Sequence, residues 1–131
     1  MNKKRGFSLI EILVVIGLIV ALMAALVPTI INVRRRAATS TTKSTLREVE
    51  TSIEAFYNDT GAYPQSLDDL LKRPSEERAK NWSGPYLGTK TYPVDGWKRK
   101  IEYKFLGDSN PDGQQFEVYS RGEDGKGHIT A

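Results

Sequence analysis

The sequence predicts an α+β protein in which one long N-terminal α-helix packs on a small antiparallel β-sheet and the first half of that helix spans a membrane. Three patterns indicate this fold. No residue between Ile12 and Ile31 is charged, and about twenty helical residues cross a bilayer core. Apolar residues recur every three or four positions between Leu46 and Phe56. Apolar and polar residues alternate in two short stretches near the C-terminus.

Composition restricts the function classes. The chain has 131 residues, no cysteine and a formal net charge of +3. A disulfide, a thiolate nucleophile and a Cys-ligated zinc site are therefore excluded. Without Lys3, Lys4 and Arg5, the 16 acidic residues face an equal number of Lys and Arg residues. The excess positive charge thus belongs to the N-terminus and indicates targeting, so no nucleic-acid partner is expected.

The apolar segment admits three interpretations. A cleaved secretory signal would have a shorter apolar region, about 7–15 residues, and a small-residue cleavage site that Ala25-Leu26-Val27-Pro28 does not offer. A plain signal anchor explains the length and the basic N-terminus. It does not explain Glu11, a carboxylate at the edge of the apolar run. The third interpretation, a retained helix whose basic leader is removed, rests on a resemblance.

The first charged and apolar residues read Lys3-Lys4-Arg5-Gly6-Phe7-Ser8-Leu9-Ile10-Glu11. This stretch closely resembles the leader junction of type IV pilins and of the pseudopilins of type II secretion. The resemblance implies that a membrane peptidase cuts between Gly6 and Phe7, removes the leader 1–6 and N-methylates Phe7. Segment 7–33 would remain as the transmembrane and filament-core helix, and residues 34–131 would form a periplasmic domain.

Glu11 has a physical reason to matter in such a filament. Cleavage would create a positive amine at Phe7, and the amine of a neighbouring subunit can neutralise the buried carboxylate. Removing one member of such a pair typically costs about 3–5 kcal/mol. The alternative is a solvated Glu11 at the level of the lipid head groups. Pro28 breaks the helical hydrogen-bond pattern, so we expect a kink at the membrane exit or a bend or melting on assembly.

The elements beyond Pro28 follow from periodicity and turn residues. Polar residues 34–45 continue the helix, the apolar stripe Leu46, Val49, Ile53 and Phe56 follows, and Gly61 ends it, so one helix should run from about Ser8 to Asn58. We expect a short helix from Ser66 to Leu71, an ordered aromatic loop over 74–96, strands around 101–105 and 116–118, and a turn over 107–113. The order of the tail 121–131 is left open.

This second half resembles the major pseudopilin of type II secretion, in the segments Tyr57–Pro64, Trp82–Leu87, Pro93–Trp97 and Tyr119–Gly125. Gly96 and Lys98 stand where that group usually has proline and glycine. The resemblance implies calcium binding by the C-terminal loop, where Asp124 matches the first carboxylate. The later aspartates are missing, and calcium takes about 6–8 oxygen ligands, so Asp124 is a weak candidate and no firm metal or cofactor is expected.

Two other polar features favour ordinary structural roles. Residues 108–113 match the opening of an EF-hand loop, but Tyr119 occupies the position of the closing Glu, so a polar hairpin turn is favoured. His128 is the single histidine and is expected to be solvated. The chain has no Gly-x-Ser-x-Gly, phosphate-loop or His-Glu-x-x-His motif, so no enzymatic activity is predicted.

The resemblance implies a structural subunit of a periplasmic pseudopilus that drives type II protein secretion across the outer membrane. The protein would cross the bacterial inner membrane once, with its C-terminal domain in the periplasm. Implied partners are copies of itself, minor pseudopilins, the prepilin peptidase and the inner-membrane assembly platform, while Arg34–Arg36 are placed to contact membrane lipid. A type IV pilus subunit used for adhesion, twitching or DNA uptake and a non-polymerising membrane-anchored binding protein remain alternatives.

Overall fold

The computed structural model of the chain describes residues 5–75, 77–107 and 109–131. These residues divide into two compact units, one ending at Arg36 and one spanning Ala37–Ala131. A single helix, α1 (Leu9–Thr60), contributes to both units. Its ends agree with the predicted helix to within a few residues. Gly61, in the left-handed region with φ +73°, closes it by donating its N–H to the carbonyl of Tyr57 at 2.7 Å.

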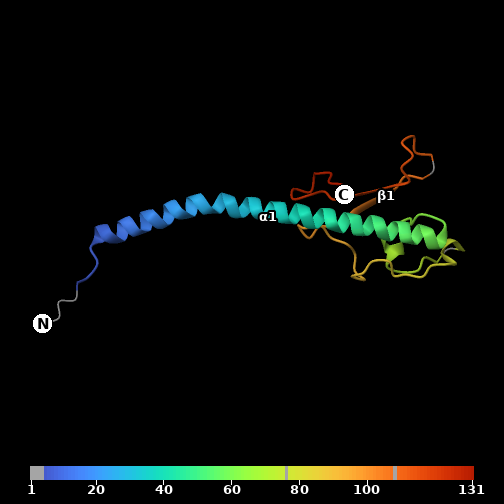
Figure 1. Cartoon of the computed structure of the whole chain (residues 1–131), viewed down its shortest axis with the longest axis horizontal. Coiled ribbons are helices and arrows are strands. Elements are labelled where there is room, and N and C mark those ends of the chain that lie inside the picture. The colour runs from blue at the N-terminus through green and yellow to red at the C-terminus, as the bar shows by residue number, and fades with distance from the viewer. Residues whose placement is uncertain (1–4, 76, 108) are drawn as a thin grey trace. The chain divides into compact units, whose positions relative to one another are not determined.

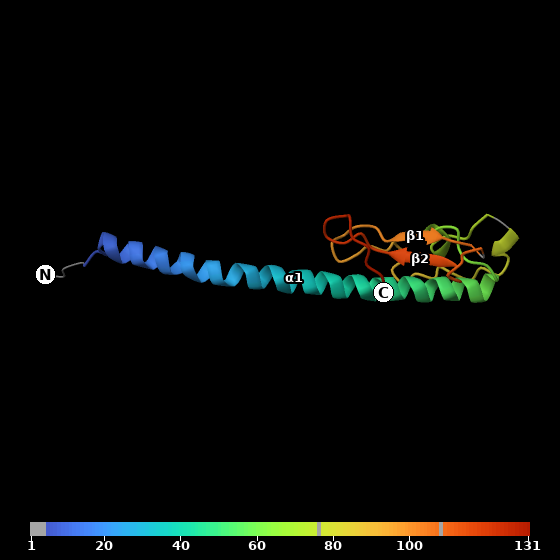
Figure 2. The same ribbon diagram turned by 90° about the horizontal axis from the view of Figure 1, so that it is seen from above.

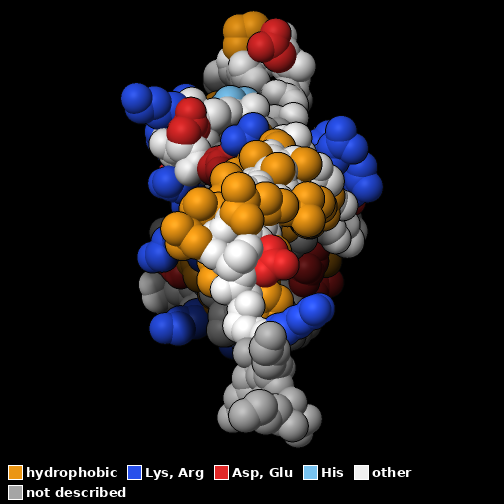
Figure 3. Space-filling model, turned by 90° about the vertical axis from the view of Figure 1, so that its left-hand side faces the viewer, with side chains coloured by type: hydrophobic (Ala, Val, Ile, Leu, Met, Phe, Trp, Pro, Cys, Tyr) orange, Lys and Arg blue, Asp and Glu red, His pale blue; other side chains and the backbone are white. Residues whose placement is uncertain are grey.

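The first unit presents its apolar side chains outward. Leu9 is 76% exposed, Leu13 59% and Ile30 53%, because no other element among the described residues 5–36 covers the helix. Figure 3 shows apolar side chains gathered in a contiguous patch on the face viewed from the N-terminal side. Among the described residues, α1 is the helix long and apolar enough to cross a membrane. Such exposure is costly in water and favourable in lipid or against other apolar helices.

Pro28 lies inside α1, and the helix is assigned on both sides of it. The proline ring has no N–H, so one hydrogen bond of the helix is missing there. The predicted bend or melting near Pro28 on assembly concerns a different state of the chain and stays a prediction.

The second unit is built on the last turns of α1. Figures 1 and 2 show the strands β1 (Glu102–Phe105) and β2 (Phe116–Tyr119) side by side along this part of the helix. The strands pair antiparallel, with Tyr103 opposite Val118 and Phe105 opposite Phe116. Both strands form where the alternating pattern predicted them. The α+β fold class is therefore confirmed.

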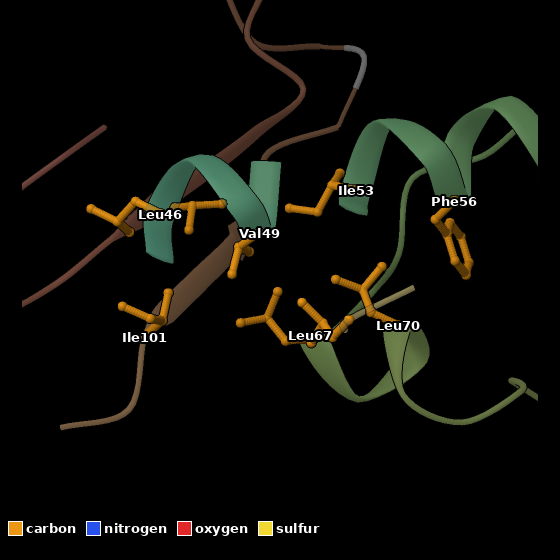
Figure 4. Close-up of a cluster of buried hydrophobic side chains, with 9 residues drawn as sticks. Leu46, Val49, Ile53, Phe56, Leu67, Leu70 and Ile101 are labelled. Atoms are coloured by element: carbon orange, nitrogen blue, oxygen red, sulfur yellow. The ribbon is translucent and has the colours of Figure 1, made fainter. Parts of the chain in front are cut away.

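The apolar stripe of α1 forms the core of this unit. Leu46, Val49 and Ile53 are completely buried, and Figure 4 shows them, with Phe56, directed toward side chains from the rest of the domain. The facing side chains come from the short 3-10 helix η1 (Leu67–Leu70) and from the segment entering β1: Leu67, Leu70 and Ile101. Fully burying such a side chain contributes about 1.5–3 kcal/mol. The stripe is thus the packing face of the domain, as its 3.6-residue period predicted.

Two predicted loops, the aromatic loop over 74–96 and the turn over 107–113, can be compared with the structure. Within the described residues of 74–96, which leave out Glu76, a second short 3-10 helix forms, η2 (Glu77–Ala79), and Trp82 packs edge-on against Tyr86. The turn between β1 and β2 is flanked by strands, as the hairpin interpretation requires, and Gly113 donates its N–H to the carbonyl of Asn110 at 3.0 Å. Asp108, the first residue of the EF-hand match, lies outside the described residues.

Candidate functional site

The predicted leader junction is an exposed, non-helical segment. Gly6, Phe7 and Ser8 precede the first residue of α1, and the Phe7 side chain is 85% exposed. A Cβ added at Gly6 would meet no atom within 4 Å. The fold of the chain therefore makes no demand for glycine at position 6, so a requirement for glycine would have to come from whatever binds the junction. A non-helical, exposed peptide bond is accessible to a protease.

Glu11 is held by the start of its own helix. The backbone N–H of Ser8 donates to Glu11 Oε2 at 2.7 Å, and the N–H of Glu11 donates to Ser8 Oγ at 3.3 Å. This reciprocal pair is a capping box, which satisfies two of the free N–H groups at a helix start. The Ser-x-x-Glu spacing is a sequence signal for this capping box. Ser8 is therefore a residue of the site that was missed.

The surroundings of Glu11 are apolar. Phe7, Ile10, Val14 and Val15 line a shallow hollow in the surface beside the carboxylate. An ionised carboxylate in such surroundings is stable only with hydrogen-bond donors or a cation. In the single chain, the Ser8 N–H supplies one donor. Among the described residues 5–15 around it, no Lys or Arg side chain forms a salt bridge with Glu11.

The end of the first unit carries positive charge. Arg34, Arg35 and Arg36 lie on consecutive positions of α1 and are exposed. They follow the uncharged run after only two further residues, Asn32 and Val33. Basic side chains at this distance from an apolar span are suited to contact anionic head groups.

The loop Trp82–Leu87 is fastened to the end of α1 and to η1. Trp82 Nε1 donates to the carbonyl of Asp69 at 2.9 Å. Tyr86 Oη donates to Asp59 Oδ2 at 2.7 Å, and Ser83 Oγ donates to the same oxygen. These hydrogen bonds, that from Ser83 first, hold the pKa of Asp59 below its ordinary value of 3.8. The motif Trp82–Leu87 therefore has a structural role, because its side chains hold the loop against α1 and η1.

The loop Pro93–Trp97 is organised by a buried carboxylate. Asp95 is 2% exposed. Its Oδ1 accepts the N–H groups of Trp97 and Arg99, each at 2.9 Å, and its Oδ2 accepts the hydroxyl of Ser120 at 2.7 Å. Three donors replace the water that a buried carboxylate loses. Asp95 thereby joins this loop to the end of β2, an anchoring role that the sequence analysis did not assign to it.

The next residue makes the closest approach of this loop to α1. Gly96 donates its N–H to Thr42 Oγ1 at 3.0 Å, and that hydroxyl donates to the carbonyl of Ala38 at 2.8 Å. A Cβ at position 96 would lie 2.2 Å from the Ala38 oxygen. Proline, which the family pattern usually has here, would lose the N–H and add ring atoms. Glycine in place of the family's usual proline at position 96 thus allows the close contact of this loop with Ala38 and Thr42 of α1.

The C-terminal tail is ordered and forms a closed loop. Ser120 and Ile129 exchange two backbone hydrogen bonds of 2.9 Å, which settles the order left open for residues 121–131. His128 is about half exposed, stacks on Tyr119 and places Nε2 3.0 Å from Glu117 Oε1. It is therefore exposed, as expected of a solvated residue, and it also contacts its neighbours.

Asp124, the weak calcium candidate, lies on this loop. It is exposed, and its Oδ1 accepts the N–H of Lys126 at 2.9 Å. Across the part of the chain that the structure describes, no three His, Cys, Asp or Glu residues are grouped to hold a metal ion. Calcium requires several oxygen ligands, so the side chains present do not fit it.

Comparison with known proteins identifies the family. The sequence profile described as "Type II secretion system (T2SS), protein G" matches residues 29–130, and the profile described as "Prokaryotic N-terminal methylation motif" matches residues 1–27. The chain belongs to the type II secretion system protein G family. It is thus a pseudopilin of type II secretion, as its two motif regions predicted, and the resemblance stated from the sequence is confirmed.

Individual relatives of the protein G family agree along nearly the whole chain. The chain is 36% identical to "Type II secretion system core protein G" of Xanthomonas campestris pv. campestris, covering 94% of this chain and 81% of the relative. It is 33% identical to the protein of the same name from Pseudomonas aeruginosa (95% and 87% covered) and 32% identical to that of Klebsiella pneumoniae (95% and 89% covered). Family membership and the apolar helix together indicate a structural secretion-system subunit anchored by one membrane span.

Proposed function

We propose that this chain is made with a leader that is cut between Gly6 and Phe7 and that the mature subunit, N-methylated at Phe7, polymerises into a periplasmic pseudopilus. The filament would push secreted proteins through an outer-membrane channel. The observation that carries the proposal is the junction itself: an exposed, non-helical Gly6–Phe7 bond lies directly before a helix whose apolar side chains are uncovered. A segment of this kind can be cut from outside and then buried among identical helices.

Glu11 has a definite place in this mechanism. Before assembly, its carboxylate accepts a hydrogen bond from the Ser8 N–H of the same chain. After cleavage, the charged amine of Phe7 lies one residue from that N–H. In a packed filament, water is excluded from the carboxylate, so the amine of a neighbouring subunit would become its cationic partner. Because a buried ion pair is stable only in good geometry, the pair would also set the register between subunits.

The proposed partners follow from the two units. The apolar part of α1 would contact copies of itself and minor pseudopilins, and the leader junction would contact the prepilin peptidase. Arg34–Arg36 would rest on anionic head groups of the inner membrane while the subunit is stored there. The inner-membrane assembly platform would extract the subunit. The subunit's role is mechanical, and we assign it no catalytic residue and no cofactor.

The deciding experiment has two parts. Mass spectrometry of the mature protein is expected to find a chain that begins with methylated Phe7. In cells, Glu11→Ala is expected to remain membrane-bound but to abolish filaments and secretion, since the loss of one partner of a buried pair costs about 3–5 kcal/mol per subunit. Glu54→Ala, a matched change at an exposed glutamate of α1 in the second unit, is expected to assemble normally.

Two outcomes would contradict the proposal. A purified chain that still carried residues 1–6 would exclude processing at Gly6. Filaments of normal length and number from Glu11→Ala would show that the carboxylate has no part in assembly and would favour a chain that is merely anchored.

A further inference from the structure

The C-terminal loop of the second unit, residues 121–128, is closed by its own backbone. The pair Ser120 and Ile129 joins its two ends through reciprocal hydrogen bonds of 2.9 Å. Inside the loop, the N–H of Gly127 donates to the carbonyl of Arg121 at 2.7 Å. The N–H of Gly125 donates to the carbonyl of Gly122 at 3.3 Å. The loop is thus a compact turn structure whose carbonyl groups are partly used by its own N–H groups.

A side chain from outside the loop braces it. The guanidinium of Arg99 donates from Nη2 to the carbonyl of Glu123 at 3.0 Å. It also lies against Gly125, where an added Cβ would stand 2.7 Å from Nη1. A charged donor on a carbonyl makes a stronger hydrogen bond than a neutral one. The positive charge beside the Glu123 carbonyl is therefore supplied by a side chain of the protein, Arg99, and not by a bound ion.

The backbone of Arg99 is fixed to the same anchor that holds the base of the loop. Its N–H donates to Asp95 Oδ1 at 2.9 Å, and its carbonyl accepts the N–H of Asp95 at 2.8 Å. The other carboxylate oxygen of Asp95 accepts the hydroxyl of Ser120, where the loop begins. Because Asp95 is buried and binds both, the start of the Arg99 side chain and the base of the loop are held together.

The charges of the loop do not favour a divalent cation. Glu123 and Asp124 are equalled in formal charge by Arg121 and Lys126, and Arg121 Nε donates to Glu102 Oε1 of β1 at 3.2 Å. The Asp124 carboxylate already accepts the N–H of Lys126. A calcium ion placed among these carbonyls would face the Arg99 guanidinium at close range, and like charges repel strongly at such distances. The calcium implied by the family resemblance therefore does not fit the donor set of this chain.

We infer that the C-terminal loop of this subunit, closed by its own backbone, is braced by the Arg99 guanidinium in the place of a metal ion and that the folding of the domain is independent of calcium. A bound ion leaves when its free concentration falls, whereas a side chain cannot dissociate. The subunit would therefore keep the same loop structure in calcium-poor surroundings.

The first test needs only the full chain in detergent. Thermal unfolding, followed by the fluorescence of Trp82 and Trp97, is compared in excess EGTA and in about 5 mM CaCl2, above the roughly 10⁻⁴–10⁻³ M dissociation constants of extracellular calcium modules. The two melting temperatures are expected to agree within about 1 °C, because a ligand that does not bind cannot stabilise. A saturable rise with calcium that Asp124→Asn removes would overturn the inference.

The second test examines Arg99 directly. Arg99→Ala is expected to lower the melting temperature by about 4 °C or more and to accelerate tryptic cleavage after Arg121 and Lys126 several-fold. Arg99→Lys keeps the charge but loses the planar fork, so an intermediate effect is expected. Arg73→Ala, at an exposed arginine outside the loop, is the matched control. Unchanged melting and unchanged cleavage in Arg99→Ala would refute the role of Arg99.

These measurements do not depend on the proposed function. They report on the folded domain before any assembly, so they would stand even if the chain formed no filament.

Discussion

Gly96→Ala tests how tightly the second unit is packed. In the structure, a Cβ at position 96 would lie 2.2 Å from the carbonyl oxygen of Ala38 and 2.6 Å from its Cα. Contacts of Cβ below 3.0 Å essentially do not occur, so the loop or the helix would have to move by at least about 0.8 Å. Both atoms belong to the backbone of α1, which cannot turn aside as a flexible side chain can.

The expected cost has two contributions. Overpacking a well-packed site typically costs about 1–3 kcal/mol. Moving the loop also weakens the hydrogen bond from Gly96 to Thr42 Oγ1, now 3.0 Å, which is worth about 1 kcal/mol. The lower entropy of the unfolded alanine chain offsets about 0.4–1 kcal/mol. The net destabilisation is therefore about 1–4 kcal/mol, or a fall of roughly 4 °C or more in melting temperature for a domain of this size.

The assay is thermal unfolding of the full chain in detergent. Gly88→Ala is the matched control, because a Cβ there meets only Glu48 Oε1, at an ordinary 3.7 Å. Thr42→Val removes the hydroxyl but keeps the shape, and it is expected to cost about 1 kcal/mol. If Gly96→Ala melted within about 2 °C of Gly88→Ala, the close contact between this loop and α1 would be refuted.

Two further predictions concern backbone strain and pH. Lys98 has φ +66°, a region that costs a non-glycine residue about 1–2 kcal/mol, so Lys98→Gly is expected to raise the unfolding free energy by up to about 1 kcal/mol in denaturant titrations; a loss of stability would contradict the assigned conformation. The lowered pKa of Asp59 contributes stability that is present above its unfolded value of 3.8 and lost as pH falls through its folded value. The double change Ser83→Ala and Tyr86→Phe should flatten the pH dependence of unfolding as the pH falls below the unfolded value of 3.8, and an unchanged profile would exclude these hydrogen bonds as its cause.

The predictable part of the fold is the part with local periodicity. The helix α1 follows from an uncharged run and a 3.6-residue stripe, and its end follows from Gly61. The strands β1 and β2 follow from two-residue alternation. The closed tail was not predicted, because Ser120 and Ile129 pair across a loop whose Gly and charged residues carry no periodic signal.

The candidate site divides in the same way. Gly6, Phe7 and Glu11 were predicted from a continuous motif. Ser8 could have been predicted from the same stretch, because a capping box is recognised from two residues three positions apart. The anchoring of Arg99 and Ser120 by Asp95 depends on residues up to 25 positions apart in the chain. No spacing rule predicts which distant donors meet a given carboxylate.

The sequence by itself determined a helix that is long and apolar enough to span a membrane and that continues into a small domain, and it pointed to a leader junction, because these features depend on neighbours along the chain. Only the tertiary structure decided that Gly96 must approach Ala38 and that a guanidinium braces the C-terminal loop. Such contacts depend on how the elements pack in three dimensions, where a few tenths of an ångström separate a hydrogen bond from a clash.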